Sequence, residues 1–146
     1  MFCLKKSLSA TVYLVIVAIF CITSLLLVWS ATPPVSFKNI HITSAQTMDL
    51  RPEYPVIRKL ESKQIEDLED SLSSLKVSKR DDDLLGLTPL YSLSADSPEI
   101  GEFTVACYDL DGDNAAVIYK NRAYRFNDKK FIAYLSDICS PGVTRA

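Results

Sequence analysis

The sequence is poor in the residues on which enzyme active sites are usually built. It holds one histidine, His41, and four glycines that do not cluster. A general base, a catalytic triad or a histidine-bound metal would have to rest on that histidine, and a glycine-rich phosphate loop is excluded. His41 lies between two isoleucines, where an exposed strand residue is the simpler interpretation. We therefore expect no catalytic residues and no enzyme.

An excess of positive charge is also missing. From residue 32 onward the chain has 14 basic and 18 acidic residues. A nucleic-acid-binding domain needs a basic face, so we expect no nucleic-acid partner. The mild negative charge favours solubility instead.

Charged residues are absent altogether from residues 7–37. Within this window residues 10–31 are almost continuously apolar. An α-helix needs roughly 20 apolar residues to cross a hydrocarbon core about 30 Å thick, and a helix apolar on all sides has no face to give to water. The sequence therefore predicts a transmembrane helix over residues 10–31.

Basic residues flank this helix unequally. Lys5 and Lys6 precede it, and the first basic residue after it is Lys38. Because positive charge stays on the cytoplasmic side, we expect residues 1–9 to be cytoplasmic and residues 32–146 to form the extracytoplasmic domain of a single-pass protein of the cell membrane. A cleaved signal peptide, which would make the protein secreted, is the alternative. Its apolar region is normally shorter, about 7 to 15 residues, although Val28-Trp29-Ser30 precedes a tolerable cleavage site.

The first half of the outer domain predicts one clear helix, over residues 62–75. Its expected N-cap is Ser62, and its apolar face is formed by Ile65, Leu68, Leu72 and Leu75. The pattern further predicts a strand at 35–43, a short extended piece at 55–57 and a strand at 76–79. Thr32-Pro33-Pro34 ends the membrane helix, and irregular connections are expected at 44–54 and 81–98.

The second half predicts a strand meander followed by a helix. Strands are expected at 103–110, 115–120 and 123–126, joined by tight turns at 111–114 and 121–122. A helix over 128–139 starts at an Asn127 or Asp128 cap, stops at Pro141-Gly142 and carries at helical spacing Phe131, Tyr134, Leu135 and Ile138. The apolar faces of the two amphipathic helices must be buried against a sheet. The predicted fold class is therefore α+β, a small antiparallel sheet packed against two helices.

The same region is rich in aromatic residues, which are Tyr108, Tyr119, Tyr124, Phe126, Phe131 and Tyr134. Strand aromatics packed against helix aromatics form the core of a small domain, and this is the interpretation we favour. A peptide- or sugar-binding surface is the alternative.

Three aspartates mark a candidate calcium loop. Asp109, Asp111 and Asp113 alternate as the first ligands of such loops do, because a hard cation needs several oxygens from one tight turn. The loop then departs from the pattern, since position six is Asn114 rather than Gly and position twelve is Lys120 rather than Glu. A hairpin turn is therefore favoured, with no metal or cofactor expected, and a calcium-responsive module is the alternative.

Two cysteines, Cys107 and Cys139, fall in the predicted outer domain. In an oxidising compartment they would form a disulfide, and otherwise they would be two buried free thiols. Neither has an obvious histidine partner that would activate a nucleophile. A thiol-dependent redox or enzymatic role is a further alternative.

These features together predict a protein that acts by binding. A tethered, mildly acidic, compact domain without a catalytic set suits a binding module in the cell envelope. We expect its partners to be the membrane, through residues 10–31, and another envelope protein or a surface ligand. Tethering raises the effective concentration of such a module near other membrane components.

Overall fold

The computed structural model describes the backbone of residues 2–31 and 35–140, and the side chains of residues 9–27 and 35–140. The chain forms two compact units, Met1–Pro34 and Val35–Ala146. The predicted helix end at Thr32-Pro33-Pro34 and the predicted helix stop at Pro141-Gly142 lie outside the described residues.

The first unit is a single helix, α1, over Phe2–Ala31. Its segment Ser9–Leu27 is long and apolar enough to span a membrane or to act as a signal sequence. The hydroxyls of Thr23 and Ser24 donate to the carbonyl of Phe20, at 2.9 and 2.7 Å. These bonds satisfy the two hydroxyl donors within the helix, so they do not oppose an apolar environment.

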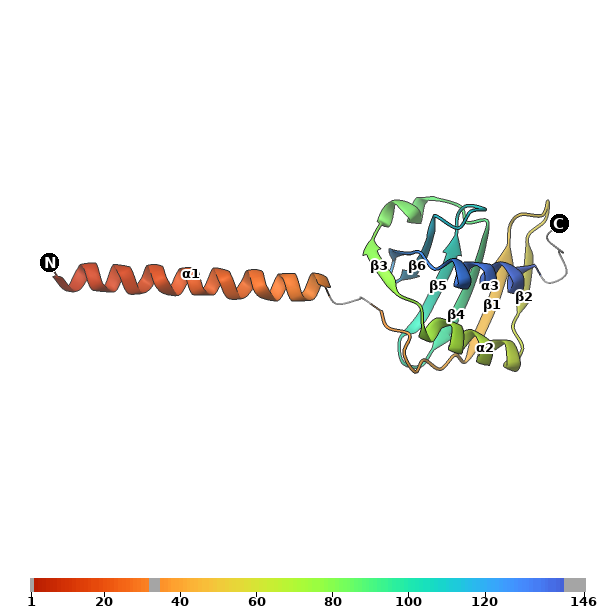
Figure 1. Cartoon of the computed structure of the whole chain (residues 1–146), viewed down its shortest axis with the longest axis horizontal. Helices are drawn as coiled ribbons and strands as arrows, with labels where there is room; N and C mark the ends of the chain where they lie inside the picture. Colours follow the sequence, from red (N-terminus) through yellow and green to blue (C-terminus); the bar gives the residue numbers. More distant parts are fainter. Residues whose placement is uncertain (1, 32–34, 141–146) are drawn as a thin grey trace. The chain divides into compact units, whose positions relative to one another are not determined.

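The second unit is an α+β domain, which confirms the predicted fold class. Its seven strands form one antiparallel sheet in the order β2-β1-β4-β5-β6-β7-β3 (Figure 1). In chain order the elements are β1 (Ser44–Asp49), β2 (Val56–Lys59), α2 (Ser62–Ser73), β3 (Val77–Arg80), the 3-10 helix η1 (Asp82–Gly86), β4 (Tyr91–Ser97), β5 (Gly101–Cys107), β6 (Ala115–Tyr119), β7 (Arg122–Phe126) and α3 (Lys129–Cys139).

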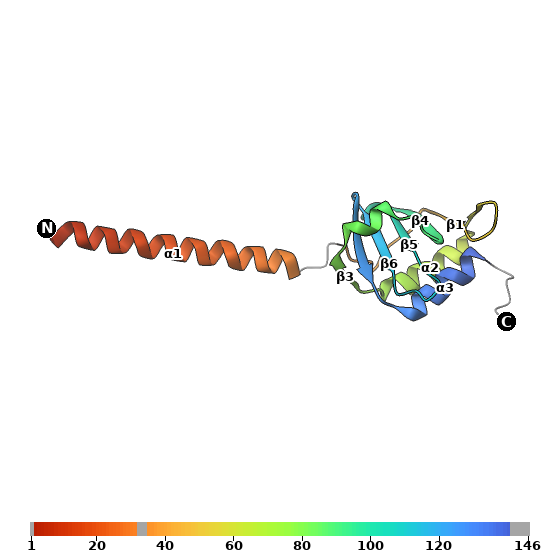
Figure 2. The same ribbon diagram turned by 90° about the horizontal axis from the view of Figure 1, so that it is seen from above.

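Helices α2 and α3 cover the same face of the sheet (Figure 2). A row of fully buried side chains crosses the four central strands beneath them, formed by Thr47, Leu93, Val105 and Val117. From above, α2 contributes Leu68 and Leu72, and α3 contributes Phe131 and Leu135. The helical spacings read from the sequence therefore identified the faces that form the core.

Residues 35–43 form no strand, contrary to the prediction. They run as an irregular segment, here called the strap, whose apolar side chains Val35, Phe37, Ile40 and Ile42 are all buried in the main core. The Phe37 ring packs against that of Phe103, with 5.1 Å between centroids. The Ile42 N–H donates to the Glu69 carboxylate of α2 at 2.6 Å. The strap is apolar because it packs into the core, not because it pairs with a strand.

Other sequence predictions also need correction. Strands β1 and β4 lie in the stretches 44–54 and 81–98, which were expected to be irregular. The N-cap of α2 is Glu61 rather than Ser62, and the Glu61 N–H donates to the side chain of Gln64 at 3.0 Å. The β6–β7 turn lies one residue earlier than expected, at Lys120 and Asn121, whose φ angles are +49° and +58°.

Candidate functional site

One end of the sheet is defined by a row of paired strand ends. Tyr91 of β4 lies opposite both Asp49 of β1 and Cys107 of β5, and Cys107 lies opposite Ala115 of β6. Three segments meet this end, 50–55, 81–90 and 108–114, and Figure 1 shows them along the upper edge of the domain. We call these three segments the rim loops.

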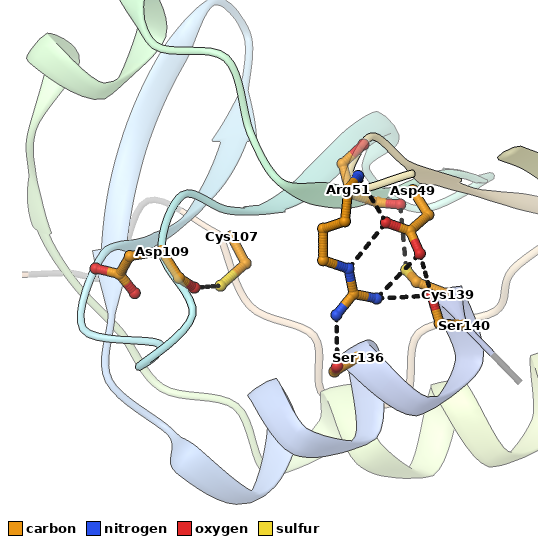
Figure 3. Close-up of polar contacts among 8 residues, drawn as sticks. Asp49, Arg51, Cys107, Asp109, Ser136, Cys139 and Ser140 are labelled. Carbon is orange, nitrogen blue, oxygen red and sulfur yellow. Dashed lines mark hydrogen bonds and ion pairs between the residues drawn. The ribbon is translucent and has the colours of Figure 1, made fainter. Parts of the chain in front are cut away.

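The first rim loop is tied to the end of α3 by a buried ion pair. The Asp49 side chain is 3% exposed and accepts hydrogen bonds from Nε and Nη2 of Arg51, at 2.9 and 3.1 Å. Arg51 also donates to the hydroxyls of Ser136 and Ser140, at 3.2 and 2.7 Å. The Ser140 hydroxyl in turn donates to Asp49 (Figure 3). Charge-assisted bonds of this kind are stronger than neutral ones, so the loop is held in one position.

The electrostatics of this pair keep both partners charged. Burial alone would raise the pKa of Asp49, but hydrogen bonds from Arg51 and Ser140 outweigh it, and the pKa lies below its ordinary value. The hydrogen bond to Asp49 raises the pKa of Arg51. The guanidinium also lies 4.6 Å from the centre of the Tyr91 ring. Arg51 is therefore satisfied by its own domain, and the cluster holds the loop in place.

The third rim loop is closed by Asp109. Its carboxylate accepts from the backbone N–H groups of Asp113 and Asn114, at 2.9 and 3.0 Å, and from the Asn114 amide at 2.6 Å. Gly112 has a φ of +74°, and a Cβ there would lie 2.8 Å from the Ile132 side chain of α3. The turn thus needs glycine both for its backbone and for its close approach to the helix.

The structure places the three candidate calcium ligands in this turn but gives them different partners. Lys129 of α3 forms an ion pair with Asp113 at 2.5 Å and donates to the Asp111 carbonyl at 2.7 Å. The Lys129 ammonium therefore already neutralises part of the negative charge of this turn. Within the described residues no group of three His, Cys, Asp or Glu side chains is arranged to hold a metal ion. The geometry is that of the hairpin turn, and calcium binding stays a prediction.

A second ion pair joins two of the rim loops. Arg125 of β7 donates to the Asp81 carboxylate at 3.1 and 2.7 Å, and to the side-chain oxygen of Asn114 at 2.7 Å. In the same region Leu84 of η1 packs on Ala116 and Ala123. Each rim loop is therefore anchored at one or more residues by polar or apolar contacts to the rest of the domain.

The rim loops nevertheless expose apolar side chains. Tyr54 is 76% exposed, Leu110 is 78% exposed and Leu87 is 54% exposed. Leu85, within the second rim loop, and Ile57, two residues after the first, are exposed as well. These five are all the large exposed hydrophobic residues among the described residues after α1. Sequence reasoning missed this set. The available signal was a large apolar residue among turn formers, as in Glu53-Tyr54-Pro55 and Asp109-Leu110-Asp111.

The cysteines are free thiols in the structure, and both are buried. Cys107 donates to the Asp109 carbonyl at 3.2 Å and Cys139 to the Ser92 carbonyl at 3.7 Å, and Figure 3 shows the two side chains apart. Burial raises the pKa of Cys139 to about 12, which opposes a nucleophilic role. This arrangement matches the free-thiol alternative, and a disulfide in the cell stays a prediction.

The lone histidine lies outside the rim loops, and of the aromatic set only Tyr108 lies within them. His41 belongs to the strap, its side chain is 79% exposed, and its Nδ1 is 3.7 Å from Glu69. Phe126 and Phe131 are buried edge to face at 5.8 Å, while the tyrosines of the aromatic set are half-buried. The core interpretation is right for the two phenylalanines and partly right for Tyr108, Tyr119, Tyr124 and Tyr134.

A hollow of about 500 Å³ lies near the β6–β7 turn, at the other end of the sheet. Its lining mixes apolar and polar residues: Ile100, Glu102, Phe103, Thr104, Ile118, Tyr119, Lys120 and Asn121. Among the described residues no buried side-chain polar atom lacks a partner, so none points unsatisfied into this hollow.

Comparison with protein-family models, curated proteins and solved structures found no match to the chain. The rim loops are therefore the candidate site on the structure's own geometry.

Proposed function

We propose that this chain is a single-pass membrane protein whose Val35–Ala146 domain is an extracytoplasmic binding module, with the rim loops as its binding surface. Helix α1 anchors it, residues 1–9 are cytoplasmic, and the partner is another envelope protein or a surface ligand. The observation that carries the proposal is the exposure of Tyr54, Leu87 and Leu110 on loops that are each anchored to the domain. A fixed loop loses little entropy on binding, so an apolar tip on it favours association.

The position of the reactive side chains also supports binding over catalysis. In the described part of the chain His41 lies on the strap, and the thiols of Cys107 and Cys139 are buried. A catalytic site needs its acid, base or nucleophile within hydrogen-bond reach of a substrate. Both thiols lie at the rim end of the sheet but beneath its surface, and His41 lies on the strap, so these three side chains do not form one exposed site.

In-cell crosslinking of the tagged full-length protein tests the proposal. The tip variant, Tyr54→Ser with Leu87→Ser and Leu110→Ser, is compared with a matched variant of exposed residues on α2, Lys63→Ser with Glu66→Ser and Asp70→Ser. We expect specific crosslinked partners to be lost in the tip variant and kept in the α2 variant.

A second control places the outer domain on an unrelated membrane anchor. Partners that persist in this fusion belong to the domain, as the proposal requires. Partners that disappear with α1, or that survive the tip variant, would move the function away from the rim loops.

A further inference from the structure

The charge around the exposed tips is strongly one-sided. The three rim loops contain seven acidic residues and a single basic one, Arg51. Four nearby carboxylates are neutralised within the domain, in the pairs Asp49–Arg51, Asp81–Arg125, Asp82–Arg80 and Asp113–Lys129. The carboxylates that are not paired in this way determine the charge that the rim loops present to a partner.

Three exposed carboxylates remain without a hydrogen bond or ion pair among the described residues. They are Glu53, Asp83 and Asp111, one in each rim loop. Each lies close in sequence to an exposed apolar side chain: Glu53 precedes Tyr54, Asp111 follows Leu110, and Asp83 is four residues before Leu87. An exposed apolar side chain and a carboxylate without a hydrogen bond or ion pair thus occur together in each rim loop, with Lys129 adding a nearby positive charge only at Asp111.

Resting on the function proposed above, we infer that the rim loops bind a protein segment in which apolar side chains are interspersed with lysine or arginine. Burying Tyr54, Leu87 and Leu110 supplies the contact area, and the three carboxylates pair with the cations around it. Complementary charge also speeds encounter and disfavours partners of the same sign. Repulsion from the same carboxylates disfavours an acidic protein or an anionic lipid surface.

The acidic face of α2 provides an internal comparison. Glu66, Asp67 and Asp70 are exposed there as well, but that helix has no large exposed hydrophobic residue. If charge alone attracted the partner, the two surfaces would be equivalent. The inference requires that the rim loops bind and that α2 does not.

The test measures binding of a synthetic peptide, in which leucine and lysine alternate with serine, to the full-length protein in zwitterionic nanodiscs, with empty nanodiscs subtracted. The charge variant is Glu53→Gln with Asp83→Asn and Asp111→Asn. Its matched control is Glu66→Gln with Asp67→Asn and Asp70→Asn. We expect the charge variant to bind roughly tenfold more weakly, since three exposed pairs are lost, and the α2 variant to bind like the wild type.

Two further observations are expected. Added salt weakens wild-type binding, because charges more than about 10 Å apart are screened at 0.1 M ionic strength. A peptide with glutamate in place of lysine does not bind. Equal loss in both variants, or no binding of the lysine peptide to the wild type, overturns the inference.

Failure of the proposed function can be distinguished from failure of this inference. If the tip variant loses binding and the charge variant keeps it, the rim loops are still a binding surface, but their partner is not selected by charge. In a flotation experiment, nanodiscs that carry the wild-type protein are mixed with zwitterionic vesicles. If they float with the vesicles and nanodiscs that carry the tip variant do not, the rim loops bind lipid instead of protein. Binding unaffected by the tip variant contradicts the proposed function itself.

Discussion

At the scale of single residues, Asp49 determines how the first rim loop is held. It is buried, it is ionised, and it accepts four hydrogen bonds from Arg51 and Ser140. The buried ion pair is satisfied on both sides by serine hydroxyls, Ser136 of α3 and Ser140 at its C-cap. Removing one partner of such a pair costs more than the pair itself contributes, because the other charge is left without compensation.

We expect Asp49→Asn to lower the free energy of unfolding by about 2 kcal/mol at neutral pH, measured by urea denaturation of the full-length protein in detergent. Because the pKa of Asp49 is lowered in the folded state, its contribution is complete above its unfolded pKa of about 3.9 and is lost as the pH falls through the folded pKa. The difference between variant and wild type therefore stays constant near neutrality and narrows below about pH 4.

Arg80→Gln is the control for this experiment. It removes the exposed Arg80–Asp82 pair and should leave the unfolding curve nearly unchanged. An Asp49→Asn variant as stable as this control would mean that the buried pair does not hold the fold.

The two thiols give a prediction at the same scale. Because Cys107 and Cys139 are buried and free, neither should react with an alkylating reagent under native conditions, and both should react after unfolding without reductant. Mass spectrometry of the peptides that contain them makes the measurement. Two unmodified cysteines in the unfolded, unreduced protein would identify the disulfide instead.

At the scale of elements, the strap is a part of the core rather than a linker. Phe37→Ala removes a side chain that is 2% exposed and packs on Phe103. We expect a loss of roughly 3 kcal/mol in the free energy of unfolding, from lost burial and the cavity left behind. Lys38→Ala, at the neighbouring exposed position, should have almost no effect in the same denaturation experiment.

The Asp109 turn yields a prediction about calcium. Its oxygens already accept from backbone N–H groups and from Lys129, so millimolar calcium should shift the melting temperature no more than a sodium salt of equal ionic strength. Asp109→Ala should cost about 1–2 kcal/mol through its lost hydrogen bonds. A calcium-specific rise in melting temperature that Asp109→Ala abolishes would restore the calcium interpretation.

The sequence predicted the elements whose patterns agree with their packing. Helices α2 and α3 and the β5–β6–β7 meander have large apolar residues at the expected spacing, and β2 and β3 were also located. Strand β1 was missed because its inward side chains are Ala45, Thr47 and Asp49, which carry no hydrophobic signal. Strand β4 does alternate, with Tyr91, Leu93 and Ala95 on its buried side, but its serines and Asp96 made it resemble the Asp- and Ser-rich connection around it. The strap gave the opposite error, since apolar residues pack there without strand pairing.

The candidate site was less predictable than the fold. Asp109, Asp111 and Asp113 were correctly placed in a turn, but the side chains around them were not foreseeable from local sequence. Lys129 reaches the turn across 16 residues, and Ser140 reaches Asp49 across 91. Contacts over such separations depend on the order of strands in the sheet, which two missed strands made unavailable.

At the scale of the whole molecule, the proposed role of α1 as a membrane anchor is the feature to test. The Ser9–Leu27 segment passes the requirements for both a transmembrane helix and a signal sequence. We expect the intact chain, with its N-terminal residues, to stay in the membrane fraction after alkaline extraction, and external protease to digest only the outer domain. A soluble product whose measured mass places its N-terminus near residue 31 would establish that the signal sequence is cleaved.

The position of the strap in the sheet's core sets the order in which the domain becomes complete. Within the domain the strap is synthesised first, yet Phe37 packs on Phe103, and the last element to complete the core is α3, which ends at Cys139. The apolar side chains of the strap therefore stay uncovered until α3 has been synthesised. Folding of this domain is in consequence a late event, and the interval before it is when a newly made chain most needs protection from aggregation.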